Sequence, residues 1–173
     1  MKSKLMKINK YSALIFAVLT VFAASCAKTN SAPTVEYTQV CSNANKDKEV
    51  TVQGFLNVTD KVPCVKMLSL KRDCGFKFMD KVNITGSEII LYLAEGTDKN
   101  QAETPDAAKS SSELKPSAVF TRDEVKFRLD DGSLIVPQAN IATPVTVTGK
   151  VNFTDNGADK LCSIMATRVE KRQ

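Results

Sequence analysis

Two eleven-residue segments of the sequence are nearly the same, and both carry the period-two pattern of a β-strand. Residues 50–60 read VTVQGFLNVTD and residues 145–155 read VTVTGKVNFTD, with seven positions identical and in register. Apolar residues alternate with polar ones in each segment, which is typical of a strand with one buried face. We therefore predict strands over 49–58 and 145–153. Their predicted buried faces consist of Val50, Val52, Leu56 and Val58, and of Val145, Val147, Val151 and Phe153.

A glycine lies at the centre of each of these segments. Gly54 and Gly149 interrupt strands, where glycine usually marks a bulge or a sharp bend such as barrel closure requires. A tandem duplication does not explain the repeat, because only 18 residues follow Asp155. The two segments are better explained as strands in similar positions of one small, curved β domain.

Further strands are predicted on either side of a long polar segment. Residues 75–84 and 88–95 form a hairpin pattern, 124–136 alternates through a second turn, and 161–169 is a last strand. A short strand around Val35 and Tyr37 would precede them. The capping-box pair Thr121 and Glu124 offers a helical alternative at the start of 124–136, but the strand periodicity continues through the turn.

Residues 96–118 are polar and contain Gly, Pro and Ser. A short helix could begin there, with Thr104 as N-cap and Pro105 at the first helical position. The remainder of this segment is predicted to be a loop.

The strand order resembles the OB-fold, a five-stranded, partly open Greek-key barrel. The matching segments are EVTVQGFLNV, CGFKFMDKVNITGSEIILYLAE, TPVTVTGKVNF and CSIMATRVE, and the likeness to small OB domains of bacterial envelope proteins covers about residues 45–171. It implies a mainly β domain over 45–173, a five- to six-stranded antiparallel barrel with a polar insertion. The insertion at 96–118 and the extra hairpin at 124–136 depart from the five-strand pattern, so a sandwich or another small barrel is the alternative.

The N-terminus has the features of an export signal. An apolar run over 13–24 follows four lysines and is too short to span a bilayer, which fits a signal peptide over 1–25. Phe22-Ala23-Ala24-Ser25-Cys26 resembles the lipobox of bacterial lipoproteins, with Ala23 where Leu is commoner. The alternative is an ordinary signal peptide cut near Ala24, with Cys26 left over as a disulfide partner.

The cysteine count favours the lipoprotein interpretation. Without Cys26 the chain keeps four cysteines, an even set for an oxidising compartment, and four cysteines allow three pairings. Their positions favour a local pair, Cys64 with Cys74, and a long-range pair, Cys41 with Cys162. The resemblance implies a diacylglyceryl thioether and an N-acyl chain on Cys26, with 26–44 as anchor and tether. Because Ala27 is not aspartate, it also implies the outer membrane of a bacterial cell envelope.

The net charge of the chain does not indicate nucleic-acid binding. The whole chain has a net charge of +5, but four basic residues lie in the signal peptide and the remainder carries +1. Locally, 61–81 carries +4 and 87–131 carries −4, which usually indicates solvated faces. The alternative is a basic patch for a protein or polyanionic macromolecular ligand. Its predicted ligand-facing residues are Lys66, Lys71, Arg72, Lys77 and Lys81.

No pattern indicates catalysis, a metal or a cofactor. Histidine is absent, so imidazole-based catalysis and ligation are excluded, and the cysteines lack the close spacing of zinc sites. Asp155, Asn156 and Asp159 fall in a turn rather than a calcium loop. Phe76 and Phe78 share one face with the predicted core, which weakens a nucleic-acid interpretation of the aromatic and basic residues around them. The Asn-x-Thr sites at Asn57, Asn83 and Asn152 are predicted to be polar strand-end residues.

Two functions fit these features. The first is a lipid-anchored, non-enzymatic binding module displayed on the outer membrane for extracellular or host macromolecules. The second is a periplasm-facing structural or accessory lipoprotein that docks onto an envelope complex. Protease shaving of intact cells separates them.

Overall fold

A computed structural model describes residues 31–67, 70–81, 89–155, 157 and 160–172. The chain divides into Met1–Ser31 and Ala32–Gln173, and all the elements described belong to the second unit. The predicted signal peptide, Cys26, the turn over 85–87, Asn83, Asn156 and Asp159 lie outside the described residues. Among the described residues, no helix is long and apolar enough to cross a membrane.

The fold is mainly β, as the sequence predicts. One short α-helix, α2, and one 3-10 turn accompany ten strands in the described part of the chain. In chain order the elements are α2 (Tyr37–Val40), β1 (Glu49–Asn57), β2 (Lys61–Val65), β3 (Asp73–Met79), β4 (Ile89–Ala94), β5 (Gln101–Glu103), β6 (Ser117–Thr121), the 3-10 turn Arg122–Glu124, β7 (Lys126–Arg128), β8 (Leu134–Ile135), β9 (Thr143–Asp155) and β10 (Lys160–Lys171).

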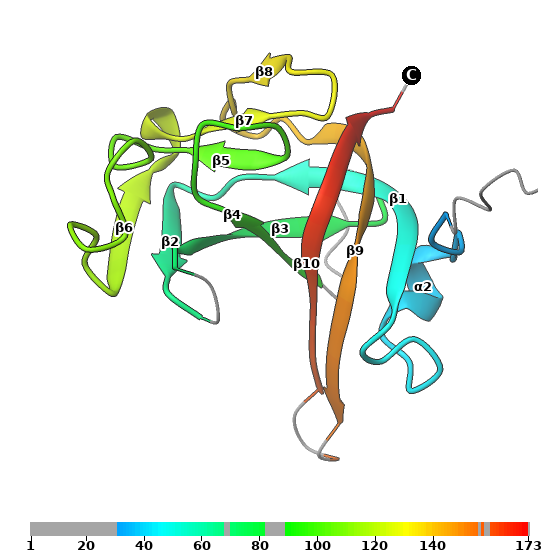
Figure 1. The fold of residues 1–173 in the computed structure, drawn as a ribbon. Helices are drawn as coiled ribbons and strands as arrows, with labels where there is room; N and C mark the ends of the chain where they lie inside the picture. Colours follow the sequence, from blue (N-terminus) through cyan, green and yellow to red (C-terminus); the bar gives the residue numbers. More distant parts are fainter. Residues whose placement is uncertain (1–30, 68–69, 82–88, 156, 158–159, 173) are drawn as a thin grey trace, which may run out of the picture. The chain divides into compact units, whose positions relative to one another are not determined.

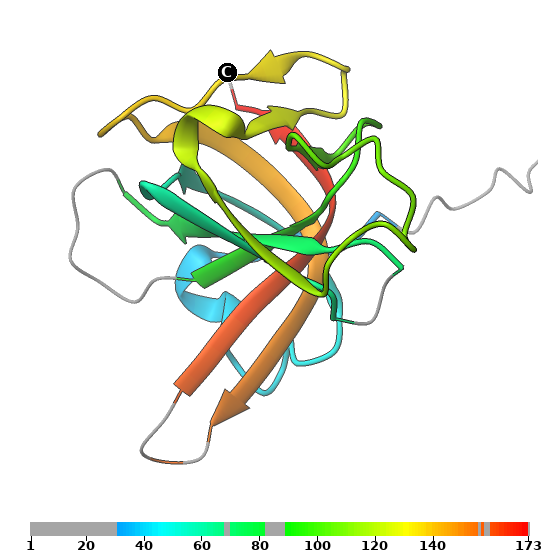
Figure 2. The same ribbon diagram turned by 90° about the vertical axis from the view of Figure 1, so that its left-hand side faces the viewer.

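Five of these strands form a closed ring (Figures 1 and 2). The ring runs β1-β9-β10-β4-β3, and β3 pairs again with β1. β9 returns by a long connection to lie beside β1, so the order β9-β1-β3-β4 is that of a Greek key. The prediction of a wholly antiparallel barrel is wrong at one seam, because β10 and β4 are parallel. A closed ring of five strands cannot be antiparallel at every seam, because the strand direction would have to alternate around an odd number of strands.

The two similar sequence segments become neighbouring strands. β1 and β9 pair antiparallel from Glu49↔Lys150 to Leu56↔Thr143, so that Gly54 faces Val145 and Gly149 faces Val50. The repeat therefore corresponds to two adjacent strands of one ring, and every residue of their predicted apolar faces is buried.

Both strand glycines lie where another part of the ring comes too close for a side chain. A Cβ on Gly54 would lie 2.5 Å from the Phe78 ring and 2.7 Å from the Met79 carbonyl oxygen. A Cβ on Gly149 would clash with the Met165 carbonyl oxygen. The register of β10 shifts between Ala166 and Arg168, opposite Gly149. The predicted association with a bulge is confirmed at Gly149, whose partner strand β10 carries the shift, whereas β1 pairs with β9 through Gly54 without a shift.

The remaining strands extend one side of the ring. β2 pairs with β3 and β6 pairs with β2, which makes β6 the last strand of the seven-stranded sheet. β5, β7 and β8 form a separate three-stranded sheet. Phe127 of β7 meets Phe76 of β3 edge-to-face with ring centroids 4.7 Å apart, so the core continues between the two sheets.

Local predictions differ from the structure at Tyr37 and after Thr104. Residues after Tyr37 form α2 rather than a strand, and the Tyr37 hydroxyl donates to the Phe78 carbonyl at 2.7 Å. The segment after Thr104 forms turns instead of a helix. The Thr104 hydroxyl accepts the Asp106 N–H at 3.1 Å, as a cap does, but the Ala107 and Lys109 N–H groups bond carbonyls three residues back, at 3.1 and 2.9 Å. At Thr121 both alternatives occur in succession, a capping box on the 3-10 turn followed by the predicted hairpin, β7 and β8.

The disulfides have the pairing that the sequence favours. Cys41–Cys162 joins the segment after α2 to β10, and Cys64–Cys74 crosses between directly opposed residues of β2 and β3. The first spans 121 residues and the second spans 10. The long bridge fixes the start of the domain to its last strand.

Candidate functional site

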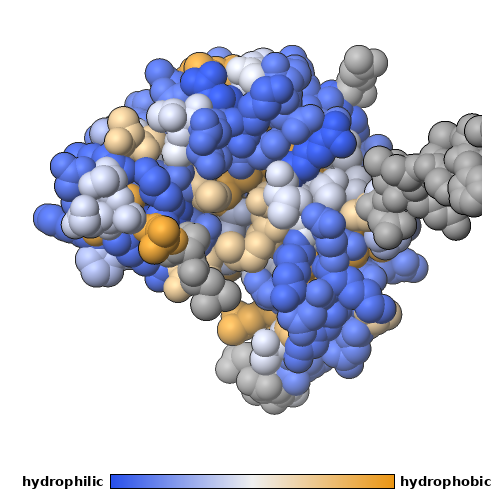
Figure 3. Space-filling model, in the orientation of Figure 1, coloured by the Kyte–Doolittle hydropathy of each residue, from blue (hydrophilic) through white to orange (hydrophobic). Residues whose placement is uncertain are grey.

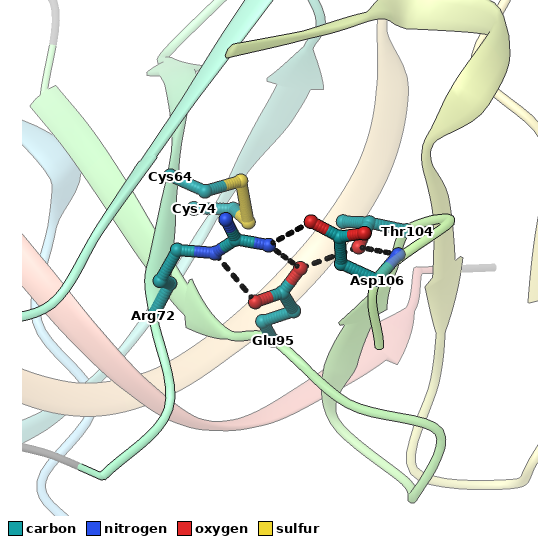
Figure 4. The surroundings of a disulfide bond; sticks show 6 residues. All are labelled: Cys64, Arg72, Cys74, Glu95, Thr104 and Asp106. Atoms are coloured by element: carbon teal, nitrogen blue, oxygen red, sulfur yellow. Dashed lines mark hydrogen bonds and ion pairs between the residues drawn. A yellow bond between two sulfur atoms is a disulfide. The ribbon is translucent and has the colours of Figure 1, made fainter. Parts of the chain in front are cut away.

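The structure places one of the predicted ligand-facing cations inside the protein. Arg72 has no solvent exposure, and its guanidinium binds the equally buried Glu95 carboxylate through Nε–Oε2 and Nη2–Oε1 contacts of 2.8 Å each (Figure 4). The prediction that Arg72 faces a ligand is wrong. A guanidinium held this way is a bidentate, charge-assisted pair within the fold.

Two residues of the polar insertion complete the cluster around this pair. Asp106 Oδ2 lies 2.8 Å from Arg72 Nη2, and the Thr104 hydroxyl donates to the Glu95 carboxylate. Arg72 precedes β3, Glu95 follows β4, and Thr104 and Asp106 follow β5. The guanidinium also lies 5.3 Å from the centre of the Phe120 ring, and Figure 4 shows it beside the Cys64–Cys74 disulfide. This cluster, the Arg72 cluster, ties the insertion to the ring.

Two lysines of the basic stretch bind the same insertion. Lys66 Nζ donates to the Ser111 carbonyl at 2.7 Å, and Lys71 Nζ donates to the Ala107 and Lys109 carbonyls at 3.2 and 2.6 Å. The basic 61–81 segment and the acidic 87–131 segment therefore bind each other in part. Their opposite net charges were the sequence signal for this contact.

The two other predicted cations lie at the surface. Lys77 alternates with the buried Phe76 and Phe78 on β3, so its side chain is on the outer face of the ring, where it is half-buried. Lys81 is exposed and follows β3. Phe76 and Phe78 belong to the core, as their shared face predicts.

An apolar row crosses the outer face of the sheet. Ile90 is 41% exposed and Val119 is 63% exposed, although both lie on strands whose alternate residues are buried. A Cβ on Gly75 would lie 3.3 Å from Tyr92, 3.6 Å from Ile90 and 3.8 Å from Pro63, so these side chains gather over one glycine. Met165 is the register partner of Tyr92, and Val119 is that of Pro63. We define the outer apolar row as Val119, Pro63, Gly75, Ile90, Tyr92 and Met165.

Figure 3 shows weakly polar and apolar atoms gathered over the middle of this face, with hydrophilic regions on either side. This row was not identified from the sequence. Pro63, Val119 and Met165 come from β2, β6 and β10, and only the pairing of these strands brings them together. Clustered, exposed apolar side chains of this kind mark interaction surfaces.

No cluster of metal-ligating side chains occurs in the described part of the chain. There, no three cysteine or acidic side chains come together as ligands for a metal. Asp155 instead accepts the Gly157 N–H at 3.0 Å and pairs with Lys160 at 3.3 Å, as a turn residue does. Asn57 and Asn152 lie on β1 and β9.

Asp106 should make stability depend on pH. The Lys109 ammonium and then the Arg72 guanidinium hold the pKa of the Asp106 carboxyl below its ordinary value of 3.8. The unfolded chain therefore binds this proton more tightly. We expect the contribution of Asp106 to be complete at neutral pH and to be lost as the pH falls below about 4, through the folded-state pKa. The difference in urea unfolding between the wild type and Asp106→Asn should be largest at neutral pH and should shrink as the pH falls below about 4. A difference that is independent of pH would contradict this assignment.

No known protein-family model matches the sequence, and no curated protein matches it.

Proposed function

We propose that the protein is a lipid-anchored lipoprotein of the bacterial outer membrane whose OB-type barrel is a non-enzymatic binding module for a protein partner. The observation that carries this proposal is the outer apolar row, which leaves Tyr92 and Ile90 at the surface of β4. In this proposal the partner is an extracellular or host protein.

The cysteines support the lipid anchor. Two disulfides use four of the five cysteines of the chain, which leaves Cys26, within the lipobox-like segment, without a disulfide partner among them. Two or more acyl chains would hold the protein on a membrane stably. A domain carrying two disulfides also suits an oxidising compartment.

The ring supports the OB assignment and the position of the site. Five strands in Greek-key order form a closed ring, which is the arrangement of OB barrels. β3 and β4 are the second and third ring strands in chain order, and OB barrels use this face for ligands. The outer apolar row crosses both strands.

The chemistry of the face favours a protein over a polyanion. Tyrosine and methionine are enriched at protein interfaces, and charged residues are depleted from interface centres. Lys61, Lys77 and Lys150 lie on the outward positions of β2, β3 and β9, which suits a partner with an acidic rim. The insertion and its flanks already bind three cations of the basic stretch, Lys66, Lys71 and Arg72. Fewer cations therefore remain to bind a polyanion than the sequence suggests.

The anchor and the exposed side can be tested in intact cells. Alkyne-labelled fatty acid should be incorporated into the wild-type chain and not into Cys26→Ala. Externally added protease should degrade the protein in cells with an intact outer membrane. Absence of the label overturns the anchor, and protection until the membrane is breached makes this a periplasm-facing accessory protein.

The binding face needs a site-specific test. The photocrosslinker p-benzoylphenylalanine replaces Tyr92 in the full chain, and Leu161, which is 67% exposed on β10, serves as the matched control position. Irradiation of cells suspended in extracellular fluid should give a discrete protein adduct from position 92 and none from position 161. Ile90→Asp should abolish the adduct from position 92. Equal labelling from both positions, or an adduct insensitive to Ile90→Asp, would overturn the proposed face.

A further inference from the structure

We infer that β6 is a self-association edge, at which a second copy of this chain adds its own β6 antiparallel. β6 is the last strand of the seven-stranded sheet and pairs on one side only, with β2 (Figure 1). Within the described ranges no backbone group bonds to its other side. Val119 of this edge also belongs to the outer apolar row, but the crosslinking test below measures self-association alone and needs no extracellular partner.

The hydrogen-bond pattern shows which residues face the open edge. The Lys66 N–H bonds the Pro116 carbonyl at 2.8 Å, and the Arg122 N–H bonds the Asp60 carbonyl at 3.1 Å, at the two ends of the β2–β6 ladder. Hydrogen-bonded and non-hydrogen-bonded pairs alternate along an antiparallel ladder. The backbone N–H and C=O groups of the even-numbered β6 residues therefore point toward β2, and those of the odd-numbered residues point toward the open edge. The Thr121 N–H is taken by the Glu124 carboxylate at 2.7 Å. Ser117 and Val119 are therefore the two positions open to another strand.

The side chains on this edge suit a strand partner. Proteins commonly protect an open edge with a charged residue at its centre. Here the centre is Val119, which is 63% exposed. In a two-fold antiparallel pairing, Val119 of each copy would oppose Val119 of the other, a favourable cross-strand pair. The outer apolar row would then continue from one copy into the next.

Charge complementarity identifies the strand partner as a second copy. Lys115 lies four residues before Val119 and Asp123 lies four residues after it. A two-fold axis through Val119 brings the start of one β6, beside Lys115, next to the end of the other copy's β6, where Asp123 lies in the 3-10 turn Arg122–Glu124. Lys115 is exposed and has no ion-pair partner among the described residues, and the side chain of Asp123 is 91% exposed. The pairing creates two ion pairs that the single chain lacks.

Cysteine crosslinking in cells tests the pairing with the full chain. Val119→Cys should give a disulfide-linked species of twice the monomer mass on a non-reducing gel, in at least about tenfold greater yield than Leu161→Cys, an equally exposed control. In the Val119→Cys background, Lys115→Glu should lower the yield several-fold. The double change Lys115→Glu with Asp123→Lys should restore it.

Each result bears on the inference. A yield equal to that of the control, or crosslinking to a protein of another mass, overturns self-association through β6. A yield that Lys115→Glu leaves unchanged, or that Asp123→Lys fails to restore, overturns the two-fold register.

Discussion

Replacing Cys41 and Cys162 together with alanine should lower the free energy of unfolding by about 4–5 kcal/mol. This disulfide joins residues 121 positions apart and fixes the segment after α2 to β10. In the chain-entropy account, a bridge restricts the unfolded chain more as the loop it closes lengthens. Urea unfolding followed by far-ultraviolet circular dichroism measures the loss.

The second disulfide provides the matched control. Cys64→Ala with Cys74→Ala opens a loop of only 10 residues, so we expect a loss of about 3 kcal/mol or less. Cys64 and Cys74 are register partners, so we expect the β2–β3 pairing to hold them near each other without the bridge. A loss from the short bridge that equals or exceeds the loss from the long one would show that native-state packing, and not loop closure, dominates.

The ring strands were predictable because burial of one face dictates their sequence. Val50 and Val52 on β1, and Val147 and Val151 on β9, are fully buried at alternate positions, as the period of two requires. Gly149 lies opposite the register shift in β10, where a side chain has no room. Strand pairing was less accessible, because the parallel contact of β4 with β10 has no local sequence signal.

The insertion and the candidate site were less predictable for a related reason. Lys71 and Arg72 are adjacent in sequence, yet Lys71 binds backbone carbonyls near the surface and Arg72 is fully buried. The partners of Arg72 lie 23 and 34 residues away, so no local window contains them. Thr104 has a helix-cap sequence and its hydroxyl accepts the Asp106 N–H as a cap does, but it also donates to Glu95 and the chain continues in turns. Tertiary contacts override local propensity at each of these positions.

The Arg72 cluster gives the second large prediction. Arg72→Met should lower the free energy of unfolding by about 3–5 kcal/mol, because it leaves the fully buried Glu95 carboxylate without its guanidinium. The same change removes one of the two cations that bind Asp106, so the insertion over 96–118 should be cleaved faster in limited proteolysis. Lys109→Ala, which removes a side chain 52% exposed, should cost no more than about 1 kcal/mol.

A compensating change separates the loss of a pair from the exposure of a lone charge. Replacing both partners, Arg72→Met with Glu95→Met, removes the buried charges together and fills the space with apolar atoms. If the cost of Arg72→Met comes from the unpaired, buried Glu95 carboxylate, the double variant should recover most of the stability and much of the resistance to proteolysis. If the double variant is as unstable as the single one, the bidentate geometry itself holds the insertion against the ring. In that case the cluster is needed for the orientation of the insertion as well as for charge balance.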